Sequence, residues 1–304
     1  MSYSRIIKAA SLVVLSSILF LFLLEGCLRI GGYLLSKKVD LREAQSEDFN
    51  IICLGDSFTY GISTESIYAY PAQLERMLNG AHLSRNFKVF NLGVPGSNSS
   101  QQLRYLKSIF SKYKNINLVI VLTGANDNWN FADSNIYELT KKGNRRNGSA
   151  TINLEAVLLK TRLYKMLKIV ALHLQGKSPE LNLFNRTREN RDFGRETVIA
   201  LLAYNLKGMV EAAQANNAGI ILQNYPHARS ESFKDISVKL GVPLVDNYAN
   251  FQERLNEVKK KDLFIFDNAH PNANGYRIMA EAIFKVITGQ ILNVKTTPHP
   301  HEGS

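Results

Sequence analysis

Three residues of this 304-residue chain have the types and the order that nucleophilic catalysis requires. Ser57 directly follows a short apolar run, and Asp267 and His270 stand three residues apart much later in the chain. A serine hydroxyl is a weak nucleophile at neutral pH, so a histidine must accept its proton and a carboxylate must orient that histidine. One loop with Asp-x-x-His spacing can supply both groups. The pattern predicts acyl transfer through an acyl-serine, with Ser57 as nucleophile, His270 as base and Asp267 as its partner.

Such a reaction also needs hydrogen-bond donors already in place for the oxyanion. The sequence offers three: the backbone N–H of Ser57, the backbone N–H of Gly93 and the side-chain amide of Asn126. Glycine leaves room for a ligand beside its N–H, and asparagine is a neutral donor. Each of these residues alone is also typical of a turn. Their occurrence together with the serine and the histidine favours the oxyanion role.

Four more residues are candidates for the substrate pocket: Asp56, Asn128, Trp129 and His227. For Asp56 we favour a cap on the turn after the strand over contact with substrate. Asn128 and Trp129 follow the oxyanion asparagine, although a lone tryptophan in such a loop is equally typical of a core. His227 comes after a later apolar run, where it is either a second pocket residue or a structural histidine.

Short apolar runs predict the elements that position these residues. The run at 51–54 indicates a strand buried on both faces of a parallel sheet. The other predicted strands are 87–92, 118–122, 219–224 and 242–246, and the predicted helices are 70–79, 100–112, 196–216, 230–240 and a last one opened by Pro271. This alternation predicts a three-layer α/β/α sandwich, with its ligand site at the carboxyl ends of the strands.

Four blocks of the sequence resemble the SGNH (GDSL-type) hydrolase family, and they occur in the family's order. They are Gly55-Asp56-Ser57, Asn91-Leu92-Gly93, Gly124-Ala125-Asn126-Asp127 and Asp267-Asn268-Ala269-His270. The resemblance covers about residues 49–129 and 218–288. It implies a flavodoxin-like, five-stranded parallel sheet with strand order 2-1-3-4-5. It also implies the roles given above for Ser57, Gly93, Asn126, Asp267 and His270.

The composition argues against several function classes. Cys27 and Cys53 cannot form a disulfide framework, and the six histidines lack metal-ligand spacing, so we expect no metal and no cofactor. The net charge is +11, and residues 130–195 hold 13 Lys/Arg against 6 Asp/Glu. No nucleic-acid-binding module of the usual kinds is visible, so we expect no nucleic-acid partner. An anionic membrane surface or an acidic envelope polymer fits this basic stretch better.

The N-terminal segment predicts a membrane contact. Residues 9–24 carry no charge and follow Arg5 and Lys8, and about 20 apolar residues are enough to span a bilayer. An uncleaved transmembrane helix is the favoured interpretation, while lipidation of Cys27 and removal as a signal peptide remain alternatives. The resulting divisions are a membrane segment with flanks (1–35), a tether (36–48), a hydrolase domain (49–290) and a disordered tail (291–304).

The stretch 130–195 is predicted to be an insertion in the hydrolase domain, because it holds no predicted strand. It contains a basic patch at 141–148 and a helix predicted at 154–175. The apolar stripe of that helix consists of Leu159, Leu163, Met166, Leu167, Val170 and Leu174. We favour a helix packed on the domain with solvated lysines over an interfacial helix or a lid on the active site. We expect the parts outside the resemblance to select the substrate.

These features predict a membrane-anchored serine esterase whose domain lies on the outer, periplasmic or extracellular face. O-acyl esters of envelope glycans are the expected substrates, with water as the acceptor. The alternatives are a lipid esterase or thioesterase, an O-acyltransferase with the same triad, and a non-catalytic carbohydrate-binding module. Attachment to the inner face of the membrane is a further alternative.

Overall fold

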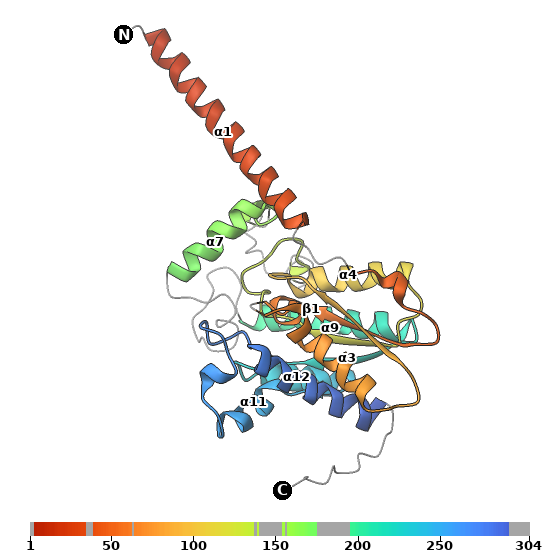
Figure 1. Cartoon of the computed structure of the whole chain (residues 1–304). Coiled ribbons are helices and arrows are strands. Elements are labelled where there is room, and N and C mark those ends of the chain that lie inside the picture. Colours follow the sequence, from red (N-terminus) through yellow and green to blue (C-terminus); the bar gives the residue numbers. More distant parts are fainter. Residues whose placement is uncertain are drawn as a thin grey trace.

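A parallel sheet of five strands organises the fold (Figure 1). The computed structural model describes residues 3–34, 39–62, 64–136, 139, 154–155, 157–174 and 195–291. The strand order β2-β1-β3-β4-β5 confirms the flavodoxin-like order that the resemblance implied. The strands are β1 (Phe49–Gly55), β2 (Phe87–Gly93), β3 (Leu118–Leu122), β4 (Gly219–Gln223) and β5 (Leu244–Val245).

The register of the central strands places the catalytic candidates at one edge of the sheet. Gly55, the last residue of β1, pairs with Gly93 of β2 on one side and with Leu122 of β3 on the other. The ends of β1, β2 and β3 therefore lie side by side. The segment after β1 carries Ser57, and the segment after β3 carries Asn126. Both central strands are fully buried along their apolar runs, as expected for a sheet covered on both faces.

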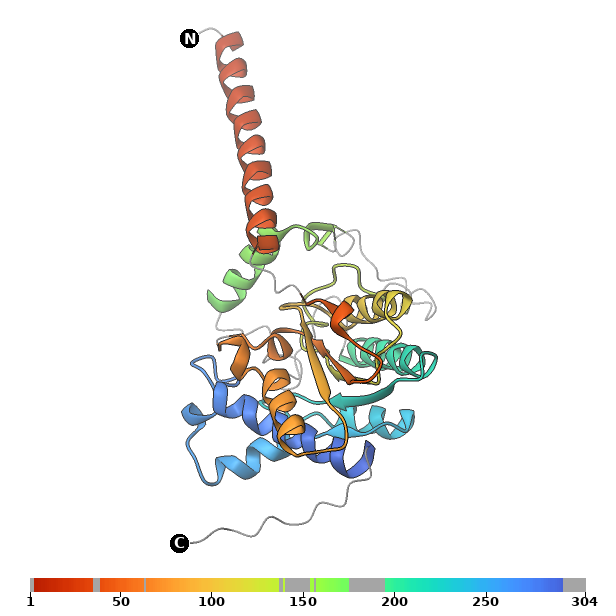
Figure 2. The ribbon, with the colours of Figure 1, turned by 45° about the vertical axis from the view of Figure 1, so that its right-hand side comes forward.

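Helices cover the two faces of the sheet and complete the three predicted layers (Figures 1 and 2). One layer holds α3 (Tyr70–Gly80), α11 (Asn247–Leu255) and α12 (Ala273–Val286). The other holds α4 (Ser99–Lys112), α9 (Arg195–Gln214) and α10 (Glu231–Leu240). The short elements are α2 (Ser57–Tyr60), three 3₁₀ turns, η1 (Leu41–Glu43), η2 (Ser66–Tyr68) and η3 (Lys260–Asp262), and a π-helical turn, η4 (Ile287–Ile291).

Some boundaries differ from the sequence-based expectations for local reasons. The last helix begins at Ala273 rather than at Pro271, because the Asn272 side chain accepts hydrogen bonds from Asn274 N and Gly275 N and caps it. The helix predicted at 154–175 is interrupted by a turn, and α7 (Arg162–Leu174) starts after it. The basic patch at 141–148 and most of the predicted tail lie outside the described residues.

The N-terminal helix α1 (Tyr3–Leu34) stands away from the domain (Figure 2). Its 26-residue segment Ile7–Gly32 contains an 18-residue stretch with a mean hydropathy of 2.4, none of it buried in the protein. This length and composition are compatible with a membrane anchor or a signal sequence. The helix itself does not show on which side of a membrane the domain lies.

Part of the predicted tether packs on the domain. Leu41 and Ala44 are buried in the main core, and the Lys88 side chain donates a hydrogen bond to the Glu43 carbonyl at 3.0 Å. Residues 35–38 lie outside the described part of the chain. The described portion from Val39 to Asp48 therefore packs as part of the domain and not as a free tether.

Candidate active site

Ser57 is placed by a tight turn between β1 and α2. Asp56 caps α2, with Oδ1 accepting from Phe58 N at 3.1 Å. Gly55 must lack a side chain here, because a Cβ atom would lie 2.0 Å from Thr59 Oγ1 and 2.8 Å from the Leu122 carbonyl oxygen. The turn puts the serine at the first position of a helical turn, where backbone N–H groups have no partner within the helix.

His270 and Asp267 lie beside this serine and form a continuous hydrogen-bonded chain with it. His270 Nε2 is 2.9 Å from Ser57 Oγ, and His270 Nδ1 is 2.5 Å from Asp267 Oδ2. The His270 ring also stacks on Phe58 with 4.3 Å between ring centroids. Residues from opposite ends of the domain sequence thus lie next to each other at the edge of the sheet.

The loop that carries Asp267 and His270 is held closed by its own backbone. Ile265 N donates to the His270 carbonyl at 3.0 Å, and Phe264 and Pro271 form an isolated β-bridge. Asn268 adopts a left-handed conformation with φ 58°, which asparagine tolerates better than most residues. The closed loop fixes the imidazole through its main chain as well as through the carboxylate.

The surroundings of the Asp267 carboxylate favour its charged form. Burial raises its pKa, but hydrogen bonds from the His270 ring and from the N–H groups of Ala269 and His270 outweigh that effect, so the pKa lies below its usual value. The carboxylate is consequently ionised at neutral pH. It can hold a proton on His270 Nδ1 and leave Nε2 as the acceptor that faces the serine.

Asn126 lies in a network of polar groups that includes Asp56, the residue before the serine. Its Nδ2 donates to the Ser97 carbonyl at 3.0 Å and to Asp56 Oδ2 at 3.3 Å, and its Oδ1 accepts from Trp129 Nε1 at 2.8 Å. These contacts fix the orientation of the amide. They also occupy both of its N–H groups, so an oxyanion must share or replace one of these bonds.

The N–H of Gly93 already has a hydrogen-bond acceptor, whereas an oxyanion donor was expected to be available to a ligand. The Gly93 N–H donates to Asn91 Oδ1 at 3.0 Å, and a Cβ atom on this glycine would lie 2.1 Å from Tyr60 N. The residue therefore packs against the backbone of α2. Gly96, further along the same segment, is left-handed with φ 73°, and its N–H makes no hydrogen bond among the described residues.

The four pocket candidates fall into two groups. Asp56 and Trp129 are buried, Asp56 as the cap described above and Trp129 in a second apolar cluster with Phe131 and Leu159. Asn128 and His227 are partly exposed, and the His227 ring stacks on Phe58 at 5.4 Å. The favoured capping role of Asp56 agrees with this geometry, and both His227 and His270 stack on the Phe58 ring.

Two positioning residues were missed by the sequence analysis. Tyr225 donates its hydroxyl to Asp56 Oδ2 at 2.6 Å and accepts from Ala125 N at 3.1 Å, which links β4 to the serine turn and to the Asn126 segment. Lys168 of α7 donates to the Trp129 carbonyl at 2.9 Å and pairs with Glu155. Tyr225 directly follows the predicted strand 219–224, at the same edge of the sheet as Ser57, and this position was the available signal.

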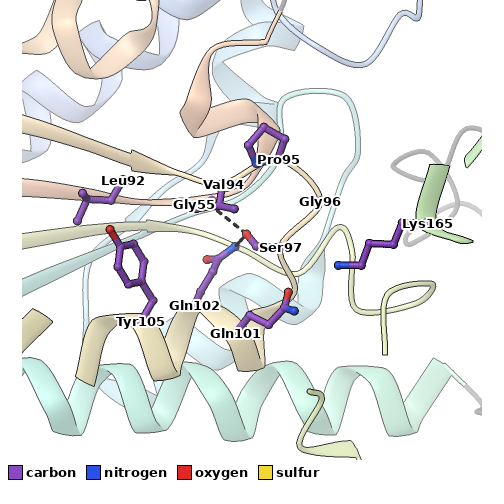
Figure 3. Close-up of a pocket in the computed structure, with 10 residues that line it drawn as sticks. All are labelled: Gly55, Leu92, Val94, Pro95, Gly96, Ser97, Gln101, Gln102, Tyr105 and Lys165. Atoms are coloured by element: carbon purple, nitrogen blue, oxygen red, sulfur yellow. Dashed lines mark hydrogen bonds between the residues drawn. The ribbon is translucent and has the colours of Figure 1, made fainter. Parts of the chain in front are cut away.

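A cavity of about 290 Å³ lies next to the same strand ends (Figure 3). It is lined by Gly55, Gly96 and Ser97, and Lys165 of α7 points towards it. Ser97 Oγ donates to the Gly55 carbonyl at 3.3 Å and so forms part of its wall. Neither Ser57 nor His270 lines this cavity. It therefore borders the turn that carries the nucleophile without containing the reacting groups.

The Trp129 indole should assist catalysis by orienting Asn126. Replacing Trp129 by phenylalanine removes the N–H but keeps most of the ring, and one such hydrogen bond corresponds to about a tenfold effect. We expect kcat for nitrophenyl acetate to fall by up to about tenfold with little change in KM. Steady-state kinetics on the full chain measures both constants, with the partly exposed Tyr204→Phe as the matched control. An unchanged kcat would remove the positioning role.

Asp127 should make stability depend on pH. Burial raises the pKa of Asp127 to about 7, although its hydrogen bonds from Ser99 N and Ser99 Oγ lower it. The pKa of Asp127 in the folded protein exceeds its value of about 3.9 in the unfolded chain. Protonated Asp127 therefore stabilises the fold fully below about pH 3.9, and this contribution is lost as the pH rises through about 7. We expect Asp127→Asn to gain on the wild type between pH 5 and pH 8, by about 5 °C in Tm. Melting curves at several pH values measure this, and a difference independent of pH contradicts it.

The family follows from a match along most of the domain. Residues 53–278 match the model of the GDSL-like Lipase/Acylhydrolase family. The chain belongs to this family. The description of the family, lipase and acylhydrolase, supports an ester hydrolase, and the resemblance seen in the four sequence blocks is confirmed.

Individual relatives of this GDSL-like hydrolase are distant. An uncharacterized protein of Mycoplasma pneumoniae is 33% identical over 78 residues, which cover 26% of this chain and 9% of that protein. The crystal structure of TesA is similar over 79% of this chain and 98% of its own, with 16% identity and a TM-score of 0.49. The psychrotrophic esterase EstA of Pseudoalteromonas sp. is similar over 81% and 100%, with 17% identity and a TM-score of 0.48.

Proposed function

We propose that this chain is a membrane-anchored serine esterase in which Ser57, His270 and Asp267 form the catalytic triad. The observation that carries the proposal is the continuous chain of contacts from Ser57 Oγ to His270 Nε2 at 2.9 Å and from His270 Nδ1 to Asp267 at 2.5 Å. The 2.9 Å between Ser57 Oγ and His270 Nε2 lies in the range in which a base can take the proton of a nucleophile.

In the proposed reaction His270 Nε2 takes the Ser57 proton while Oγ attacks the ester carbonyl carbon. The tetrahedral intermediate collapses, the C–O bond to the alcohol breaks, and His270 returns the proton to the leaving oxygen. Water then attacks the acyl-serine in the same way, which releases the acid and restores Ser57. A sugar hydroxyl in place of this water would make the enzyme a transferase.

The oxyanion donors we propose are Ser57 N–H and the Asn126 amide, both at the carboxyl edge of the sheet. The third donor predicted from the sequence is Gly93 N–H, and to act in this way it must leave Asn91 Oδ1. Gly96 is the alternative third donor, because its N–H is uncommitted among the described residues. Each donor is worth about 100- to 1,000-fold in rate.

We propose that α1 remains attached as the anchor. Two hydrogen bonds support this: Glu25 of α1 accepts from Arg162 N at 3.0 Å and from Leu163 N at 2.9 Å, at the start of α7. Cleavage of α1 as a signal peptide would leave these donors without the carboxylate. An outer-face location remains part of the proposal.

The substrates we propose are O-acyl esters of envelope glycans, since an anchored domain with a basic insertion suits an acidic polymer close to a membrane. Lipid esters are the second candidate. The feature that favours them is Phe266, which is 93% exposed directly before Asp267 and offers an apolar surface next to the triad.

The substrate class can be tested with the full chain in detergent. The panel would comprise O-acetylated glycan fragments, short- and long-chain lipid esters and an acyl thioester, and acid release would be measured against the His270→Ala variant. We expect the acetylated glycans to be hydrolysed fastest. Faster release from the long-chain lipid esters would replace the glycan proposal by the lipid one, and acyl transfer to an added sugar would indicate the transferase.

A further inference from the structure

Helix α7 packs Tyr164 and Ile169 against the second apolar cluster but also has apolar side chains on its outward face. Its outward face shows Met166, Leu167, Val170 and Leu174, which are 43%, 54%, 49% and 85% exposed. The polar side chains of Lys165 and Lys168 point inward, Lys165 towards the cavity and Lys168 to the Trp129 carbonyl. A surface helix of a water-soluble protein has the opposite arrangement, with its apolar stripe facing the core.

The apolar surface extends beyond α7 into the turn before it and into the helical residues that lead to that turn. Leu154 and Val157 are 59% and 60% exposed, whereas Leu159 between them and α7 is fully buried in the second apolar cluster. The turn is therefore attached to the domain through Leu159 and leaves other apolar side chains outside. An apolar area of this kind on a protein marks an interaction site.

Polar contacts fasten this element to the membrane helix. Besides the two bonds from α7 to Glu25, Arg29 Nη2 donates to the Lys160 carbonyl at 3.0 Å, and Arg162 Nη1 donates to the Leu28 carbonyl at 3.2 Å. The contacts run in both directions between the two helices. They fix the start of α7 against the domain-proximal end of α1, and α7 runs across the axis of α1 rather than along it (Figure 1).

The length of α1 places this junction at the membrane boundary. The 26-residue segment Ile7–Gly32 would measure about 39 Å at 1.5 Å per residue, against about 30 Å for the hydrocarbon core. Glu25 is the first charged residue after the uncharged run 9–24. The carboxylate that caps α7 therefore lies where the hydrocarbon gives way to the headgroups.

From this geometry we propose that α7 and the turn before it form an interfacial element that inserts its outward apolar side chains into the bilayer surface around α1. The partner is the lipid surface itself, and the inference rests on the proposal that α1 stays in the membrane. Lys168 contacts Trp129, which in turn contacts Asn126, so the element also holds the active site next to the lipid surface.

The test is a nitroxide scan of the full chain in liposomes, with collisions with oxygen and with a water-soluble nickel complex as readout. Labels would be placed by Leu167→Cys on α7, Leu19→Cys on α1 and Val238→Cys on α10, in a Cys27→Ser background; Cys53 is buried and does not react. We expect oxygen to broaden the signals from positions 19 and 167 more than nickel does, and the reverse at position 238. Leu174→Cys repeats the test on α7 if the first variant does not fold.

Each other outcome overturns the inference in its own way. A label at 167 that behaves like the one at 238, while the label at 19 reports lipid, shows that α7 lies in water. Dipolar broadening at 167 that disappears on dilution with unlabelled chain shows that a second copy covers the face. A label at 19 that reports water removes the anchor, and with it the interfacial element, but leaves the esterase proposal untouched.

Discussion

Replacing Ser57 by alanine is expected to lower the hydrolysis of nitrophenyl acetate by the full chain by about 10⁴- to 10⁶-fold. The change removes the atom that attacks the ester and keeps the fold, because the Ser57 side chain hydrogen-bonds only to His270 among the described residues. The proton acceptor and the oxyanion donors remain, so a small residual rate over water is expected. Initial rates at saturating substrate measure the loss.

A second serine supplies the matched control. Ser237 on α10 is buried, like Ser57, and its hydroxyl donates only to the Lys234 carbonyl at 2.9 Å. Ser237→Ala should therefore keep the wild-type rate. If Ser57→Ala hydrolysed nitrophenyl acetate as fast as the wild type, another group would be the nucleophile.

Replacing Asp267 by asparagine should cost about 10⁴-fold in kcat. An asparagine amide would donate to His270 Nδ1, which places the remaining ring proton on Nε2. That nitrogen, 2.9 Å from Ser57 Oγ, could then no longer accept the serine proton. The loss would come from the wrong tautomer, with the ring still in place.

Kinetics of Asp267→Asn beside Asp235→Asn separates this effect from a general loss of charge, because Asp235 is exposed on α10. The low pKa of Asp267 adds a pH condition. The carboxylate is the form present above its depressed pKa, so the wild type should not lose activity through Asp267 until the pH falls below its usual value of about 3.9. An Asp267→Asn enzyme with wild-type kcat would contradict the orienting role.

The sheet and the triad geometry were predictable because they depend on simple patterns. Apolar runs such as 51–54 are long enough to mark strands buried on both faces, and parallel strands bring their carboxyl ends to one edge. Ser57 follows the first of these runs, so its place at this edge was predictable. The Asp-x-x-His segment follows no strand, and its approach to Ser57 was expected from the joint occurrence of the four family blocks. Hydrogen-bond distances confirm this proximity, while the catalytic roles stay proposals until the variants are measured.

The rest depends on contacts between segments that are distant in the sequence. The helix predicted at 154–175 is interrupted because Leu159 is buried and Glu25 of α1 caps the start of α7. Nothing in the periodicity of that segment indicates a partner so far away. Similarly, the N–H of Gly93 is engaged by Asn91, which only the side-chain geometry reveals.

The most direct measurement of the central claim is the site of reaction with a fluorophosphonate, read by mass spectrometry of the labelled full chain. An activated serine attacks phosphorus, fluoride leaves, and the phosphonyl group stays on Oγ. We predict one adduct on the peptide that contains Ser57, and its loss in the His270→Ala variant. An adduct on a different serine, or ester hydrolysis that persists after complete labelling of Ser57, would contradict the account.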